Sequence, residues 1–128
     1  MTARLAADRR APAEARSYVA RQLGSLSLPP GVPVDDVVLI ASELVTNSVR
    51  GGADWVDLSV RTTPERLDLL VEDDADGWPV LGTPDEDAVN GRGLGIVDRL
   101  ADAWVVTARD RGKVVTVTWL ARTADVSP

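Results

Sequence analysis

The sequence predicts an α+β fold with two layers, in which helices cover one face of a mostly antiparallel mixed sheet. Three observations predict it: two segments repeat apolar residues at helical spacing, two pairs of segments alternate apolar and polar residues, and turn-forming residues separate each pair. A chain of 128 residues with 45% hydrophobic content is enough for one ordinary core. We place a single domain at residues 1–121 and a flexible, frayed tail at 122–128.

The N-terminal part of the chain predicts a short strand and two helices. We expect an edge strand at Thr2–Ala6 and a first helix at about Pro12–Leu23, where a proline suits the first turn and apolar residues recur every fourth position. A second helix, Val34–Arg50, begins with acidic residues in its first turn and ends at Gly51. Its expected buried stripe consists of Val37, Ile40, Ala41, Leu44 and Ser48.

The rest of the sequence, from Asp54 onward, predicts two hairpins. A long loop and a short helix are expected between them. Asp73–Asn90 is rich in acidic residues and turn formers and lacks a sustained apolar period, so it is expected to be the loop. A short helix is expected after Gly95, running to about Leu100. The expected hairpin strands are Asp54–Thr62, the alternating segment Leu67–Val71, Trp104–Arg109 and Val114–Leu120.

Composition excludes several classes of protein. With 14 basic and 20 acidic residues, the chain has a formal charge of -6 and a pI of about 4.5, so we expect no direct nucleic-acid partner. The chain has no cysteine and no histidine, which excludes disulfide scaffolds, thiolate and imidazole metal sites, and serine–histidine hydrolase triads. No segment approaches the roughly 20 apolar residues of a membrane span. We therefore expect a soluble, cytoplasmic protein that has no membrane partner.

The glycine-rich run Gly91-Arg92-Gly93-Leu94-Gly95 is a candidate phosphate site. Its glycines tolerate positive φ and remove side chains that would block a ligand, while the helix start that follows offers unpaired N–H groups to anionic oxygen. A flexible loop that ends at a helix start is an equally good interpretation. The run is not a Rossmann motif, because Ile96 stands at the third glycine, and Gly112-Lys113-Val114 is not a P-loop.

Glu43 and Asn47 are candidates for metal and proton chemistry. Residues four apart on a helix share a face, so a carboxylate and an amide oxygen can converge on one point. An amide oxygen can complete a Mg²⁺ shell made of phosphates and water, and the carboxylate then remains free to accept a proton. The alternative is an exposed helix face that carries these residues by chance, although asparagine has poor propensity inside a helix.

The acidic segment that begins at Asp73 follows a strand directly. A carboxylate at a strand end can accept a hydrogen bond from the exocyclic amine of a purine base, which makes Asp73 a candidate base anchor. A calcium loop competes, because Asp74, Asp76 and Gly77 match part of an EF-hand, but Glu72 stands at the first ligand position. A solvated acidic turn is the third interpretation.

Taken in order, these motifs resemble a known superfamily. Glu43-Leu44-Val45-Thr46-Asn47, then Asp73 with Gly77, then the glycine-rich run follow the order seen in GHKL (histidine-kinase-like) ATPases. More narrowly, the chain resembles the anti-sigma-factor serine/threonine kinases of that superfamily, over nearly its whole length. The resemblance implies the Bergerat fold, an α/β sandwich that holds ATP between its helices and its sheet.

Carried onto this sequence, the resemblance implies a role for each motif. It makes Glu43 the general base, Asn47 the Mg²⁺ ligand and Asp73 the adenine anchor. Gly77 would shape the base pocket, and the segment from about Val80 to Asn90 would act as a lid. The residues that would line the phosphates are Gly91, Arg92, Gly93, Leu94 and Gly95.

The sequence departs from the family pattern at three positions. Ala75 stands where the family often has a glycine, Gly51 where a histidine often follows arginine, and Val114 where a threonine often supports the base. A missing hydroxyl at a buried polar contact costs about 1 to 3 kcal/mol. Thr116 lies on the same strand face as Val114 and is the candidate that would replace the hydroxyl in the nucleotide site.

Three functions are compared. The leading hypothesis is an ATP- and Mg²⁺-dependent protein serine/threonine kinase that phosphorylates an anti-anti-sigma antagonist protein and separately holds a sigma factor inactive. The resemblance alone supplies these partners, and it also suggests a homodimer, for which Trp55, Trp78 and Trp119 are contact candidates that would equally suit the core. The second hypothesis is a binding module with the same fold and no catalysis. A sensor histidine kinase domain is disfavoured, because the chain has no histidine to phosphorylate.

Overall fold

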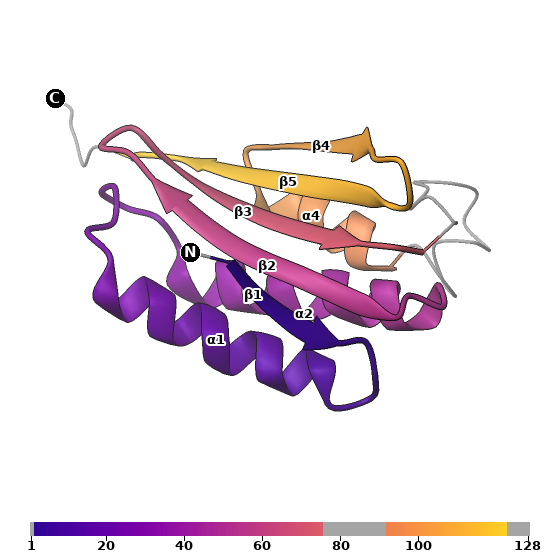
Figure 1. Cartoon of the computed structure of the whole chain (residues 1–128). Coiled ribbons are helices and arrows are strands. Elements are labelled where there is room, and N and C mark those ends of the chain that lie inside the picture. Colours follow the sequence, from indigo (N-terminus) through magenta and orange to yellow (C-terminus); the bar gives the residue numbers. More distant parts are fainter. Residues whose placement is uncertain (1, 76–91, 123–128) are drawn as a thin grey trace, which may run out of the picture.

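The computed structural model describes residues 2–75 and 92–122. In this part of the chain, a twisted sheet forms one layer and the helices form the other (Figure 1), so the predicted two-layer α+β sandwich is confirmed. The elements in chain order are β1 (Thr2–Ala6), α1 (Ala11–Ser25), α2 (Val34–Arg50), β2 (Trp55–Thr62), β3 (Arg66–Asp73), α4 (Arg92–Leu100), β4 (Ala103–Ala108) and β5 (Lys113–Leu120).

The sheet has the strand order β1-β2-β3-β5-β4, and every pairing among the described strands is antiparallel. The two predicted hairpins, β2–β3 and β4–β5, are both present, and β3 pairs with β5 to join them. The mixed sheet that we expected is therefore antiparallel throughout the described strands. This pairing places the end of β3 directly beside the start of β5, where Asp73 faces Lys113 across the strands.

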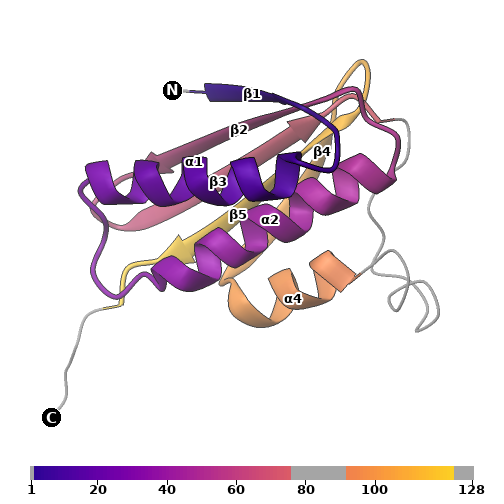
Figure 2. The same ribbon diagram turned by 90° about the horizontal axis from the view of Figure 1, so that it is seen from below.

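The core lies between the sheet and the helix layer, which Figure 2 shows as α1, α2 and α4 side by side over one face of the sheet. All five residues of the stripe predicted for α2 are buried. Trp119 is fully buried and donates from Nε1 to the carbonyl of Leu100 at 3.0 Å, so it belongs to the core and not to a surface contact. Trp55 lies beneath the Arg4 guanidinium, 4.0 Å from the ring centroid, and Trp78 lies outside the described residues.

Two boundaries differ from the sequence prediction. Helix α4 begins at Arg92 rather than after Gly95, because packing of α4 against α2 holds two glycines in helical conformation despite their poor propensity. Arg122, which we placed in the tail, donates its backbone N–H to the carbonyl of Pro30 at 2.7 Å and its guanidinium to Asp102 at 3.1 Å. The contacts of the domain therefore extend through Arg122.

No helix within residues 2–75 and 92–122 has both the length and the apolar character needed to cross a bilayer.

Gly112 lies in the turn between β4 and β5, where the chain passes very close to the end of β3. Its φ of 86° favours glycine, and a Cβ atom built on it would lie 1.8 Å from the carbonyl oxygen of Asp73. No side chain fits at this distance. The turn therefore requires glycine, and the close approach fixes the start of β5 against the end of β3.

The turn yields the first prediction. Replacing Gly112 with Ala should lower the free energy of unfolding by about 3 kcal/mol or more, because it adds a backbone clash to a strained φ. Gly52 is the matched control: its φ is 87°, but a Cβ there meets no described atom within 4 Å. Gly52→Ala should therefore cost only the backbone strain, about 1 to 2 kcal/mol. Urea unfolding of both variants measures the difference, and equal losses would contradict the close approach.

Candidate functional site

Helix α2 presents Glu43 and Asn47 one turn apart, both half-buried. The Nδ2 atom of Asn47 is buried and has no hydrogen-bond partner among the described residues. A buried amide without a partner costs free energy, and turning the amide over would place its oxygen there instead. Either orientation leaves a polar atom that a bound group would satisfy. The predicted pair therefore lies together, and Asn47 has the unmet hydrogen-bonding capacity of a ligand-binding residue.

Asp73 is the most heavily hydrogen-bonded carboxylate of the described residues and is almost completely buried at the end of β3. Its Oδ2 accepts from the Ser48 hydroxyl at 2.5 Å, and its Oδ1 accepts from the Ala75 backbone N–H at 3.0 Å. The Lys113 ammonium contacts both oxygens, at 2.9 and 2.8 Å. Ser48 directly follows Asn47 on α2, so this network places the base-anchor candidate beside the Glu43–Asn47 face.

Asp74 joins the same end of β3 to the start of β2. Its Oδ1 accepts the backbone N–H groups of Asp54 at 2.8 Å and Trp55 at 3.2 Å. Burial by itself raises the pKa of this carboxyl, but these amides, its own amide and the charge of Arg111 outweigh burial, so the pKa lies below its ordinary value. Asp74 thus acts as a strand connector, which supports neither the calcium loop nor a freely solvated turn.

Two of the departures from the family pattern lie next to each other. A Cβ built on Gly51 would lie 3.6 Å from the Cβ of Ala75, an ordinary van der Waals contact. The methyl group of Ala75 therefore lies next to the space that the glycine leaves at the end of α2. The nearest atom to such a Cβ is the carbonyl oxygen of Asn47, at 3.3 Å.

The predicted phosphate-binding run opens helix α4, which packs against α2. Because α4 begins at Arg92, the backbone N–H groups of Arg92, Gly93 and Leu94 have no acceptor within the helix. A Cβ built on Gly95 meets no described atom within 4 Å, so the backbone there is open to a ligand. Gly91, Gly77 and the predicted lid at residues 80–90 lie outside the described residues.

The structure does not bring Thr116 to Asp73, which differs from the predicted position of Thr116 in the nucleotide site. Val115 and Val117 face the helices as part of the core, so Val114 and Thr116 lie on the opposite face of the sheet. Val114 indeed lines a small polar hollow on that outer face. The residue that faces Asp73 is Lys113, so the departure at Val114 does not affect the base anchor.

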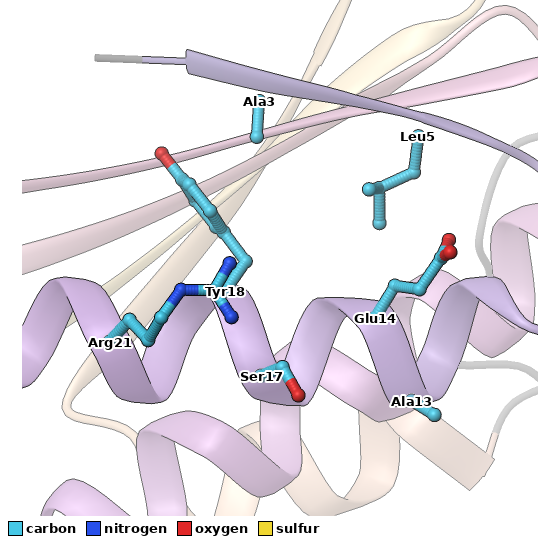
Figure 3. A pocket seen from close by; sticks show the side chains of 7 residues that line it. All are labelled: Ala3, Leu5, Ala13, Glu14, Ser17, Tyr18 and Arg21. Carbon is cyan, nitrogen blue, oxygen red and sulfur yellow. The ribbon is translucent and has the colours of Figure 1, made fainter.

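A separate groove lies between β1 and α1, at one edge of the sheet (Figure 3). It has a volume of about 440 Å³ and is open to solvent. None of the predicted site residues lines it. Its lining residues are Ala3, Leu5, Ala13, Glu14, Ser17, Tyr18 and Arg21.

Two members of the Asp73 network were not predicted as site residues. Ser48 was expected in the apolar stripe, where a hydroxyl among aliphatic residues was the available signal of a buried polar contact. Lys113 was left out because the last strand was expected to begin at Val114, although a residue two positions before Val115 lies on the inner face. A lysine at a core-facing position indicates a buried acidic partner.

These geometric findings agree with a comparison against protein families. The model of the histidine kinase-like ATPase domain matches residues 5–119. The chain belongs to this family. A search of curated proteins found no match. Membership implies an ATP-binding regulatory domain, and the antiparallel sheet with its helix layer is consistent with the histidine kinase-like ATPase fold.

The described residues fit an ATP-binding role. The Nδ2 atom of Asn47, which has no partner among residues 2–75 and 92–122, and the N–H groups at the start of α4 lie on two helices that pack together, and both suit a phosphate-bearing ligand. Asp73 offers a carboxylate at the adjoining strand end. Asn47 would hold the metal together with phosphates, Asp73 would meet the base, and α4 would meet the phosphates.

The second prediction concerns Asp74. A lowered pKa in the folded state means that the charged carboxylate stabilises the fold above its ordinary pKa of 3.8, and that this contribution is lost as the pH falls through the folded-state pKa. Asp74→Asn should therefore be less stable than the wild type at pH 7, and the two should converge in acid. Urea unfolding between pH 7 and pH 3 tests this, with the exposed Asp35→Asn as control. A constant difference down to pH 3 would contradict it.

Proposed function

We propose that the chain is an ATP- and Mg²⁺-dependent serine/threonine protein kinase of the anti-sigma-factor type. It phosphorylates an anti-anti-sigma antagonist protein and sequesters a sigma factor. The observation that carries the chemical part is the buried Nδ2 atom of Asn47, which has no hydrogen-bond partner among the described residues and lies one turn after Glu43 on the helix that packs against α4. The resemblance of the ordered motifs to the anti-sigma-factor kinases supports the two protein partners.

The proposed reaction assigns one task to each group of the site. ATP with Mg²⁺ supplies the phosphoryl group and a metal that neutralises its charge. Asn47 completes the metal shell, and the N–H groups at the start of α4 orient the phosphates. Glu43, which is half-buried one turn before Asn47, accepts the proton of the attacking serine or threonine hydroxyl.

A second candidate is a nucleotide-binding or degenerate regulatory module that acts by contact without catalysis. One observation favours it: the hydrogen bonds of the Asp73 carboxylate to Lys113, Ser48 and Ala75 already engage both of its oxygens. A carboxylate whose two oxygens already accept these hydrogen bonds can accept another from a base amine only when one of the donors is displaced. This candidate keeps the fold and the protein partner but makes no phosphorylated product.

Phosphate transfer separates these two candidates. With labelled ATP, Mg²⁺ and candidate antagonist proteins, the wild type should label serine or threonine, and Glu43→Ala should lose this labelling because it lacks the proton acceptor. Glu14→Ala, which removes an exposed glutamate on α1, is the matched control and should transfer normally. If the wild type and Glu43→Ala bind ATP but neither transfers phosphate, the non-catalytic module is correct.

Base binding is tested separately by calorimetry. Asp73→Asn should reduce ATP affinity about tenfold or more, the order expected when one charged hydrogen bond is lost. Asp68 is the matched control, because it is a buried carboxylate on the same strand that accepts from Arg66 and Thr118. Asp68→Asn should leave ATP affinity unchanged, and circular dichroism confirms that both variants fold. Equal ATP affinity in Asp73→Asn and the wild type would remove Asp73 from the site.

A further inference from the structure

Lys113 is the only lysine of the chain, and the other 13 basic residues are arginines. It is also buried, whereas lysines are almost never fully buried without a partner. Its cross-strand neighbour is Asp73, the residue to which we assign the base. The one lysine ammonium group of the chain therefore lies directly on the proposed base anchor.

The ion pair leaves little acceptor capacity on Asp73. A carboxylate has about four lone-pair positions in its plane. Ser48 and Ala75 each donate to one oxygen, and the Lys113 ammonium contacts both. These four contacts use the positions that an exocyclic amine would need, and an ammonium group cannot itself accept a hydrogen bond from that amine.

The three donors differ in how readily each can move away from the Asp73 carboxylate. The Ala75 amide is part of the backbone two residues after Asp73, and the Ser48 side chain is short and buried on α2. Lys113 reaches Asp73 through a stem with four rotatable bonds, so it can move away without a change in the backbone. Lys113 is therefore the donor that an incoming amine would displace.

We propose that Lys113 is a specificity-determining residue of the base site that competes with the 6-amino group of the purine for the carboxylate of Asp73. This inference rests on the proposed ATP-binding function. The competition lowers affinity for nucleotides that carry the amine and leaves purine nucleotides without it unaffected. In the absence of ligand, the same ion pair stabilises the junction of β3 and β5.

The experiment compares two ligands and two variants by calorimetry with Mg²⁺ present. Lys113→Met keeps most of the stem and removes the charge and the donors, so it should raise ATP affinity about tenfold. Purine riboside 5′-triphosphate lacks the 6-amino group, and its affinity should change less than about threefold. Lys113→Arg keeps a cationic donor and should retain the wild-type affinity for ATP.

The outcomes separate the inference from the function on which it rests. If Lys113→Met weakens ATP binding, leaves it unchanged, or strengthens both nucleotides equally, competition for the amine is overturned while the ATP site remains. If neither the wild type nor Lys113→Met binds either nucleotide, the proposed function fails and the inference fails with it.

A measurement on the wild type keeps the inference testable even if Lys113→Met does not fold, since removing one partner of a buried ion pair is strongly destabilising. Labelling lysine with ¹³C at Cε gives one NMR signal, because the chain has a single lysine. Saturating ATP with Mg²⁺ should shift this signal much more than purine riboside 5′-triphosphate does. Equal shifts with the two nucleotides would overturn the competition.

Discussion

The Asp73 carboxylate connects three parts of the fold that are far apart in the sequence. Ser48 comes from α2, Lys113 from β5, and Ala75 from the chain that leaves β3. Taking a carboxylate out of water is tolerable only when it is paired and hydrogen-bonded, and loss of one partner of such a pair costs about 3 to 5 kcal/mol. Helix α2 and strand β5 both contact this carboxylate, and the close turn at Gly112 lies against the backbone carbonyl of the same residue.

In the proposed site, stability and ligand binding depend on the same atoms. The residue after Asn47 holds the carboxylate to which we assign the base, so α2 would position the proposed metal ligand and the proposed base anchor through adjacent side chains. Helix α4 packs on α2, and the N–H groups of its first turn have no acceptor within the helix. A ligand that bound here would satisfy the Nδ2 atom of Asn47, which has no partner among the described residues, but would have to compete for the carboxylate of Asp73, which has several.

Local patterns predicted much of this arrangement. The bounds of α2 agree with the sequence prediction, because acidic residues in its first turn and Gly51 at its end mark both termini, and both hairpins follow from alternation and turn residues. The start of α4 was predicted too late in the sequence. Glycine has poor helix propensity, but packing against α2 keeps the two glycines at this start in helical conformation. The contact of Lys113 with Asp73 depends on strand pairing across 40 residues, and strand alternation alone does not say which face of a strand meets which partner.

The contacts of Arg122 determine where the chain leaves the described fold. Its backbone N–H meets Pro30 in the loop between α1 and α2, at the far end of β5 from Lys113. An eight-residue strand spans about 26 Å at about 3.3 Å per residue. The chain thus leaves the described fold at the opposite end of the sheet from Asp73 (Figure 1). A surface linker attached after Arg122 would start on the side remote from that carboxylate, so an immobilised molecule would turn the end that carries Asp73 outward.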